Sequence, residues 1–413
     1  MRSHSAYGML AGLVIGGTLG IVGHLLLGDS RALAVAIDIA EPIGAIFLRL
    51  LFMLVIPLIL SALALGVAGL GDMGDLGRIG IKTLAYTVAV STCSVLIGVG
   101  LVNLVRPGDG ISPELRARLA ERAHMAPVAA PPKAAMGADF FVNLVPSNPV
   151  RAMADGDMLA VMTFALFLGV GLLLTRTEAA RRLEEGLQGL YDVTMRLLDL
   201  VIRMAPLGIA CLVFSLTARL GFDVMRQLGA YVVVVLLGLG IQQFGVYSAS
   251  VWWLGGMRPT TFFRGVREAM LTAFSTASSN ATLPTALRVA EEDLHLPPQV
   301  SRFVLTIGST ANQNGTALFE GVTVLFLAQF YGVELALGQQ VMVVVVCILG
   351  GIGTAGVPGG SLPVIAMILG MIGVPVEGIG MILGIDRFLD MCRTTLNVTG
   401  DLAAAVVVSR GER

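Results

Sequence analysis

Six polar residues near the end of the chain lie in a stretch that is otherwise apolar. They are Asp386, Asp390, Arg393, Thr394, Asn397 and Asp401. At about 100° per residue, an α-helix places all six within about 100° of arc, so they share one face of one helix. A charge at the centre of a membrane span costs at least about 2.5 kcal/mol, and such residues usually face a polar cavity. The pattern therefore predicts a functional site on this face.

The charges of this face complement a small zwitterion that carries an extra carboxylate. The guanidinium of Arg393 offers a planar fork for a carboxylate. Asp390 can accept hydrogen bonds from an ammonium group, and Asn397 can both donate and accept. An acidic amino acid is the simplest ligand with these groups. The alternative is an ion pair that only holds the helices together inside the membrane.

The composition requires elements that span a membrane. Of the 413 residues, 55% are hydrophobic and 13% are charged, whereas a soluble globular protein carries about 25% charged residues. Apolar stretches long enough for a membrane helix, about 20 residues, are predicted at 7–27, 36–70, 79–105, 140–175, 186–217 and 224–255. The net charge of −1 gives no indication of nucleic-acid binding. The four cysteines form no CxxC or Cys/His pattern, so no disulfide or cysteine metal site is expected.

Two later apolar segments, at 260–293 and 335–374, are interrupted midway by small polar, glycine and proline residues. The interruptions are residues 275–284 and 353–363. Lipid cannot satisfy the polar groups of irregular backbone, so such segments survive only inside protein or beside a water-filled cavity. A matched pair of them indicates a transporter binding site. We therefore predict two re-entrant hairpins whose tips meet near the middle of the membrane, with two ordinary kinked helices as the alternative.

Motifs along nearly the whole chain resemble the dicarboxylate/amino acid:cation symporter family, which includes the excitatory amino acid transporters and the archaeal aspartate transporters. They are Phe47-Leu48-Arg49-Leu50, Val55-Ile56-Pro57-Leu58, Pro146-Ser147-Asn148-Pro149, Ala205-Pro206-Leu207-Gly208, the serine-rich first interruption, Asn312-Gln313-Asn314-Gly315-Thr316, the second interruption, and two motifs on the last helix. These two, Asp390-Met391-Cys392-Arg393-Thr394 and Asn397-Val398-Thr399-Gly400-Asp401, are the most specific.

The resemblance implies an all-α polytopic membrane protein with eight transmembrane helices, two re-entrant helical hairpins and inverted repeats. It implies a homotrimer in a cell membrane, the inner membrane of a bacterium. A static scaffold of residues 1–73 and 111–217 would hold a transport domain of residues 74–110 and 218–413 that moves like an elevator. The expected activity is secondary active symport of glutamate or aspartate with protons, sodium ions or both, and no enzymatic reaction.

The resemblance also implies a role for each site residue. Arg393 would bind the side-chain carboxylate of the substrate, Asp390 would bind its amino group, and Asp386 would orient the guanidinium. The remaining contacts would come from Thr316, Thr394 and Asn397 and from the main chain at Ser278, Ser279, Gly356 and Val357.

Sodium ions are the only bound groups that the resemblance implies. One sodium site would consist of Asp401 with Gly308, Asn312 and Asn397. Another would consist of main-chain carbonyls at Gly351, Ile352 and Thr354 with Thr310. Oxygen ligands of this kind suit a hard cation.

The chain departs from the family at the coupling ions. The family's third sodium site uses an aspartate where this chain has Asn314, with third-span partners that correspond to Thr87, Val90 and Ser91, so we expect this site to be lost. Glu320 lies one helical turn after Thr316 and matches the candidate proton carrier of proton-coupled relatives. Burial would favour its neutral form. A structural glutamate bonded in the core is the alternative.

Three other functions are weighed against this one. A C4-dicarboxylate symporter would keep Arg393, but Asp390 would repel a second carboxylate. An anion channel needs no broken-hairpin carrier site, and an intramembrane enzyme finds no support because the chain has no GxSxG or HExxH motif.

Overall fold

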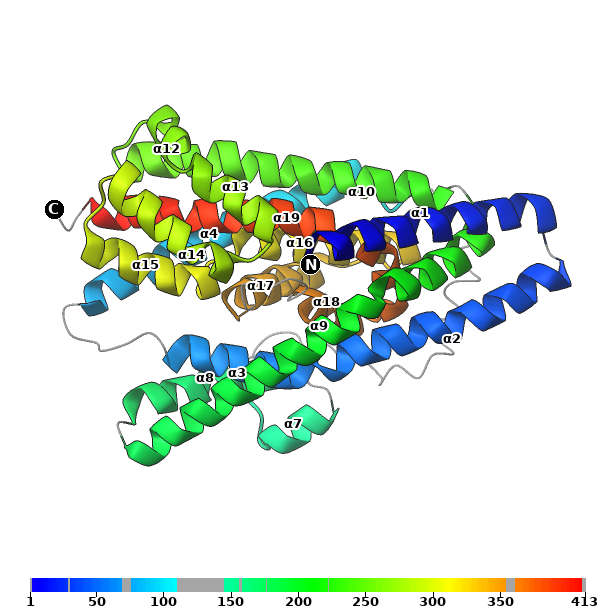
Figure 1. Cartoon of the computed structure of the whole chain (residues 1–413), viewed down its shortest axis with the longest axis horizontal. Coiled ribbons are helices and arrows are strands. Elements are labelled where there is room, and N and C mark those ends of the chain that lie inside the picture. The colour runs from blue at the N-terminus through cyan, green and yellow to red at the C-terminus, as the bar shows by residue number, and fades with distance from the viewer. Residues whose placement is uncertain are drawn as a thin grey trace.

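A computed structural model describes residues 2–28, 30–68, 76–109, 145–155, 158–175, 177–221, 223–353 and 361–410. Every regular element within these ranges is a helix, which confirms the predicted all-α class. The helices form two groups (Figure 1). The last helix, α19 (Ile379–Ser409), belongs to the second group and makes most of the contact with the first group.

The first group surrounds the long helix α9 (Glu178–Leu220). Helices α1 (Arg2–Leu27), α2 (Arg31–Met53) and α3 (Val55–Ala68) pack against it. Helix α8 (Met158–Leu174) follows the short α7 (Pro149–Asp155) and packs on α3. In Figure 1, α3, α7 and α8 lie in the lower part of the view, and α9 crosses it diagonally.

Glycines allow α1 and α9 to run side by side at very short distance. A Cβ atom at Gly12 would lie 2.4 Å from the carbonyl oxygen of Pro206, and one at Gly16 would lie 2.3 Å from that of Ala210. Only glycine fits at these two positions without a shift of backbone. Close packing through small residues is typical of helices that associate in lipid.

The continuous span predicted at 36–70 is two helices, α2 and α3, that meet at Leu54. Pro57 lies in the first turn of α3, where its missing N–H removes no helical hydrogen bond. The amide of Leu58 donates to the carbonyl of Leu54 at 3.2 Å and connects the two helices. Proline in the motif, rather than hydropathy, marks the place of this break.

The second group contains α4 (Leu76–Val105) and the described chain from α10 onward. Its further elements are α10 (Asp223–Gly240), a π-helical turn (Ile241–Val246), α11 (Tyr247–Ala249), a second π-helical turn (Ser250–Leu254), α12 (Pro259–Gly265), α13 (Arg267–Thr276), α14 (Ser279–Arg288), a third π-helical turn (Val289–Asp293), α15 (Pro298–Ala311), α16 (Asn314–Tyr331), α17 (Leu337–Gly353), α18 (Ser361–Met371), a 3₁₀ turn (Val376–Gly378) and α19. Helix α16 lies at the centre, because it packs on α4, α10, α17, α18 and α19 and is buried along nearly its whole length.

Helix pairs stand where the two hairpins are predicted. Helices α13 and α14 pack on each other and on α19, and Ala277, with φ 48°, reverses the chain between them. The hydroxyl of Ser278 caps α14 by accepting from the amide of Ala281 at 3.3 Å. Helices α17 and α18 pack on each other and on α16, and their connection, 354–360, lies outside the described residues. That the pairs are re-entrant in a membrane stays a prediction.

Two described helical stretches are long and apolar enough to cross a membrane by length and composition. They are Arg78–Val105, with a mean hydropathy of 2.2, and Val224–Leu254, with 1.9. The second ends at Trp252 and Trp253, whose exposed rings stack with centroids 6.3 Å apart. Exposed paired indoles at a helix end suit the headgroup level of a bilayer.

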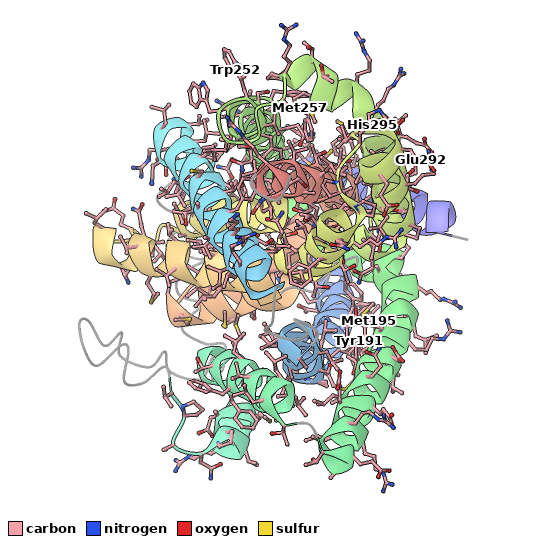
Figure 2. All side chains as sticks on the ribbon, turned by 90° about the vertical axis from the view of Figure 1, so that its left-hand side faces the viewer. Tyr191, Met195, Trp252, Met257, Glu292 and His295 are labelled. Carbon is pink, nitrogen blue, oxygen red and sulfur yellow. The ribbon has the colours of Figure 1, made fainter. Side chains whose placement is uncertain are left out.

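Figure 2 views the molecule from the end at which the C-terminus lies. Trp252 and Met257, after α10, and Glu292 and His295, before α15, lie on the second group. Tyr191 lies apart from them on α9, in the first group. The two groups are thus distinguishable from this end as well.

Helix α19 packs on the first group with its first two turns, which precede its charged residues. A Cβ atom at Gly380 would lie 3.0 Å from a methyl of Leu212 on α9, and one at Gly384 would lie 2.5 Å from a methyl of Leu13 on α1. The helix that carries the predicted site therefore also forms the boundary between the two groups.

Candidate functional site

The predicted polar face of α19 is buried within the second group. The exposed fractions of its six residues run from 1% for Arg393 to 8% for Asp390. The helical periodicity of the sequence thus places these residues correctly on one helix. Burial of charge at this level requires partners, because an isolated buried ion is very costly.

The guanidinium of Arg393 is held by side chains from three helices. Its Nη2 donates to Oδ1 of Asp386 at 2.9 Å and to Oδ1 of Asp390 at 3.0 Å. Its Nη1 donates to the hydroxyl of Ser361, the first residue of α18, at 3.2 Å. The ring of Phe319 on α16 lies below it, with Cζ 3.7 Å from the ring centroid, a cation–π geometry.

Asp390 lies between two arginines. Its Oδ1 accepts from Arg393, and its Oδ2 lies 3.6 Å from Nη1 of Arg387, one turn earlier on α19. The Arg387 and Asp390 side chains are 12% and 11% exposed. Asp386, Arg387, Asp390 and Arg393 together carry no net charge, so this cluster is electrostatically balanced without a ligand.

Asn397 connects α19 to the start of α16. Its Nδ2 donates to Oε1 of Gln313 at 2.5 Å and to the hydroxyl of Thr316 at 3.2 Å, while its Oδ1 accepts from the amide of Gly315 at 2.7 Å. Both amide hydrogens are therefore used. A ligand contact from Asn397 requires exchange of one of these bonds, most directly the longer one to Thr316. Thr394 is buried on the same face.

Asp401 faces the break between α15 and α16. Its Oδ1 accepts from Nδ2 of Asn312 at 2.9 Å. A Cβ atom at Gly308 would lie 2.6 Å from the same oxygen, so only glycine leaves room there. The buried Oδ1 of Asn312 has no hydrogen-bond partner among the described residues. A carboxylate beside an unpartnered amide oxygen is a donor set that fits a hard cation.

The second predicted cation site is only partly described. Thr310 lies near the end of α15, and Gly351 lies near the end of α17, where its carbonyl accepts from the amide of Gln313 at 3.3 Å. Ile352 is helical, and Thr354 lies outside the described residues. Gly356 and Val357, predicted to close the substrate site, lie outside them too.

Ser278 and Ser279 are buried at the turn of the first helix pair, which packs on α19. The carbonyl of Ser278 accepts from the hydroxyl of Thr282 at 2.8 Å, and the hydroxyl of Ser279 has no hydrogen-bond partner among the described residues. This buried hydroxyl could serve a ligand, and the predicted main-chain contact at Ser278 and Ser279 stays a prediction.

Both polar atoms of the Asn314 side chain are hydrogen-bonded to hydroxyl groups. Its Oδ1 accepts from Ser91 at 2.5 Å, and its Nδ2 donates to the hydroxyl of Tyr247 at 3.0 Å. Its main-chain carbonyl accepts from Ser94 at 2.8 Å. A cation here would face the amide donor of Asn314 where the family has a carboxylate. Val90 presents its main-chain carbonyl to Gln242 at 3.4 Å, and Thr87 is buried.

Glu320 is completely buried, one turn after Thr316 on α16. Neither carboxyl oxygen has a hydrogen-bond partner among the described residues. A Cβ atom at Gly350 on α17 would lie 2.9 Å from Oε2, so the carboxyl group lies against the first arm of the second helix pair. Among the described titratable groups, Arg393 and Cys347 lie close enough to interact with it electrostatically.

Sequence reasoning did not single out Arg387, Phe319, Ser361, Tyr247 or the amide of Gln313. Ser361 and Phe319 lie beside predicted features, the second interruption and Glu320, but only the packing of α18 and α16 on α19 brings them to Arg393. Arg387 carried a usable signal, because it lies one turn from Asp390 and a second charge in an apolar stretch needs a partner.

The matches to known proteins extend over nearly the whole chain. The model of the sodium:dicarboxylate symporter family matches residues 6–411. The proton/sodium-glutamate symport protein of Bacillus subtilis (strain 168) is 31% identical over 409 residues, covering 98% of this chain and 93% of the relative. The proton/glutamate-aspartate symporter of Escherichia coli (strain K12) is 32% identical over 411 residues, covering 98% and 92%.

A mammalian protein is similar at the same level. Excitatory amino acid transporter 2 of Mus musculus is 31% identical over 466 residues, which cover 99% of this chain and 78% of the relative. These relatives are membrane transporters and not enzymes. With the polar residues of the motifs on α16 and α19 buried together and a match that leaves out only the chain ends, the chain belongs to the sodium:dicarboxylate symporter family.

Proposed function

We propose that the chain is a secondary active symporter of acidic amino acids, glutamate or aspartate. The observation that carries the proposal is the buried pair on α19, in which Arg393 lies 3.0 Å from Asp390. A cation and an anion at this separation can receive the side-chain carboxylate and the ammonium group of one small ligand. The names of the bacterial relatives, glutamate and glutamate-aspartate symport proteins, support the same substrates.

Binding would proceed as an exchange of ion pairs. Without substrate, Asp386 and Asp390 neutralise Arg393. With substrate, the side-chain carboxylate of the ligand accepts hydrogen bonds from the guanidinium of Arg393. The ammonium group of the ligand donates to Asp390, and Asp386 keeps the guanidinium in place. Arg393 and Asp390 thus keep a charged partner in both states, and the one negative charge that the bound ligand adds to the cluster would be offset by a co-transported cation.

Coupling ions have two candidate carriers. Asp401 and the unpartnered Oδ1 of Asn312 are suited to hold a sodium ion. Glu320 is suited to carry a proton, because its buried carboxyl group has no hydrogen-bonded counterion among the described residues and a neutral form removes the cost of burying charge. The amide of Asn314 in place of a carboxylate supports fewer sodium ions than the family's three sites.

The two helix groups are suited to an elevator movement. The group around α16 and α19 would be the transport domain, and the group around α9 would be the scaffold that forms a homotrimer in the cell membrane. Support comes from the boundary itself, where glycines of α19 meet leucine side chains of α1 and α9 in apolar contacts. Exposed apolar side chains on α1, α2 and α10 suit contact with lipid or with other subunits.

C4-dicarboxylate symport is the second candidate, and one observation favours it. Arg387 lies near Asp390 and offsets the negative charge that would repel a second carboxylate. The amino acid reading still accounts for more, because Asp390 is a hydrogen-bond acceptor at the position where a dicarboxylate offers no donor.

The test is uptake of labelled aspartate and glutamate into proteoliposomes under separately imposed sodium and proton gradients. Concentrative uptake of either amino acid, abolished when all ion gradients collapse, is the expected result. Accumulation of succinate with no uptake of either amino acid would favour the second candidate and contradict the first.

A further inference from the structure

Arg387 is the least expected member of the buried charge cluster. Its Nη1 lies 3.6 Å from Oδ2 of Asp390, a separation that gives charge attraction without a hydrogen bond. The other oxygen of the same carboxylate already accepts from Arg393 at 3.0 Å. Oδ2 therefore keeps free acceptor capacity while it lies in the field of a second guanidinium.

The position of Arg387 bears on what the site distinguishes. An acidic amino acid brings one ammonium and two carboxylates, so it carries one negative charge, whereas a C4-dicarboxylate brings two negative charges and no donor. A cation beside Asp390 opposes an arriving ammonium and offsets the repulsion between Asp390 and an arriving carboxylate. Both effects raise the affinity for a ligand without the amine relative to the affinity for an acidic amino acid.

We infer that Arg387 is a specificity-determining residue that competes with the substrate ammonium for Asp390 and so narrows the preference for acidic amino acids over ligands that lack the amine. This inference rests on the proposed function, since Asp390 is taken as the ammonium acceptor. Its consequence is a site that binds aspartate yet tolerates succinate. Selectivity is thereby set by a residue beside the site as well as by the residues within it.

A purely structural pair would behave differently. An ion pair spaced three residues apart on one helix can stabilise that helix locally, and its loss would lower thermal stability and weaken all ligands together. If Arg387 instead competes for Asp390, its loss should strengthen the binding of aspartate relative to that of succinate. The ratio of their affinities therefore separates the two roles.

The experiment uses the full chain in proteoliposomes and measures the KM for labelled L-aspartate and the concentration of succinate that halves aspartate uptake. Three replacements are compared with the original protein: Arg387→Gln, Arg387→Ala and Arg387→Lys. The matched control is Arg302→Gln, which breaks an exposed pair with Glu291 outside the site.

The ratio of the succinate constant to the aspartate KM should rise about tenfold in Arg387→Gln and Arg387→Ala, a change of about 1.4 kcal/mol. Arg387→Lys should keep a ratio close to the original, and Arg302→Gln should not change it. Either neutral variant suffices if the other does not fold.

A ratio within threefold of the original in a folded neutral variant, or a ratio that falls, would overturn the inference while aspartate uptake still upholds the proposed function. Absence of aspartate uptake in the original protein would instead overturn the proposed function, and this inference with it.

Discussion

Asp390 lies one helical turn before Arg393 on α19, with its carboxylate 3.0 Å from the guanidinium. Both side chains are buried, so each charge is compensated mainly by the other and little by water. A ligand that offers a carboxylate to one and an ammonium to the other can replace this contact without leaving a bare charge. That exchange is the basis of the predictions below.

Asp390 and Asp386 both contact Arg393 and give a matched pair of variants. Asp390→Asn should weaken aspartate binding by about tenfold or more and spare inhibition by succinate, because only the ammonium needs this carboxylate. Asp386→Asn should weaken both ligands, because it removes the partner that orients the guanidinium. Inhibition of aspartate uptake by succinate is the measurement. Equal effects of the two variants on both ligands would contradict the assigned roles.

Glu320 should carry a proton through the transport cycle. In Glu320→Gln, uptake driven by an inward proton gradient in sodium-free buffer should fall to the level without a gradient, because the amide cannot load and release a proton. Glu334→Gln is the control, since Glu334 is exposed just beyond the same helix. An unchanged response to the proton gradient in Glu320→Gln, or strict sodium dependence of the original protein, would show this idea to be wrong.

Asn314→Asp should restore a cation site. The carboxylate would lie beside the hydroxyls of Ser91 and Tyr247, which already contact this side chain, and oxygen ligands with a negative charge suit sodium. A sodium gradient should then stimulate aspartate uptake more than it does in the original protein. Asn103→Asp, at an exposed position on α4, controls for the added charge. The same sodium response in all three proteins would rule the site out.

The boundary between the two helix groups should slide during transport. A Cβ atom at Gly380 would lie 3.2 Å from Cβ of Leu212, near the about 3.8 Å of a disulfide. The double variant Leu212→Cys/Gly380→Cys, in a background without the four native cysteines, should form a cross-link that stops uptake until it is reduced. Each single cysteine variant serves as a control. Full uptake by the cross-linked protein would contradict an elevator movement at this boundary.

Much of the site could be predicted from the sequence because helical geometry is local. The positions of Asp386, Asp390 and Arg393 on one face, and a helix break at Ser278, follow from spacing and from residue type alone. The contact of Arg393 with Phe319 could not be predicted, because it depends on how α16 packs against α19.

The contribution of Arg387 could not be predicted from its angular position on the helix, for a related reason. Its Cα lies about 60° around the helix from Asp390, outside a narrow polar face, and only its long side chain reaches back to the carboxylate. The helix break at Leu54 was not predicted, because a hydropathy profile does not recognise Pro57 as the sign of a new helix. The sequence could not show how far a long side chain reaches or how two helices pack against each other.

The central claim is that Arg393 receives the carboxylate of an acidic amino acid. Labelled aspartate uptake into proteoliposomes, measured for the original protein and for Arg393→Cys, tests it most directly, with size-exclusion elution of both as the check of folding. Loss of one member of a buried ion pair costs about 3–5 kcal/mol, so the variant should lose about 100-fold or more in aspartate kcat/KM. Aspartate uptake with unchanged affinity in Arg393→Cys would contradict the account.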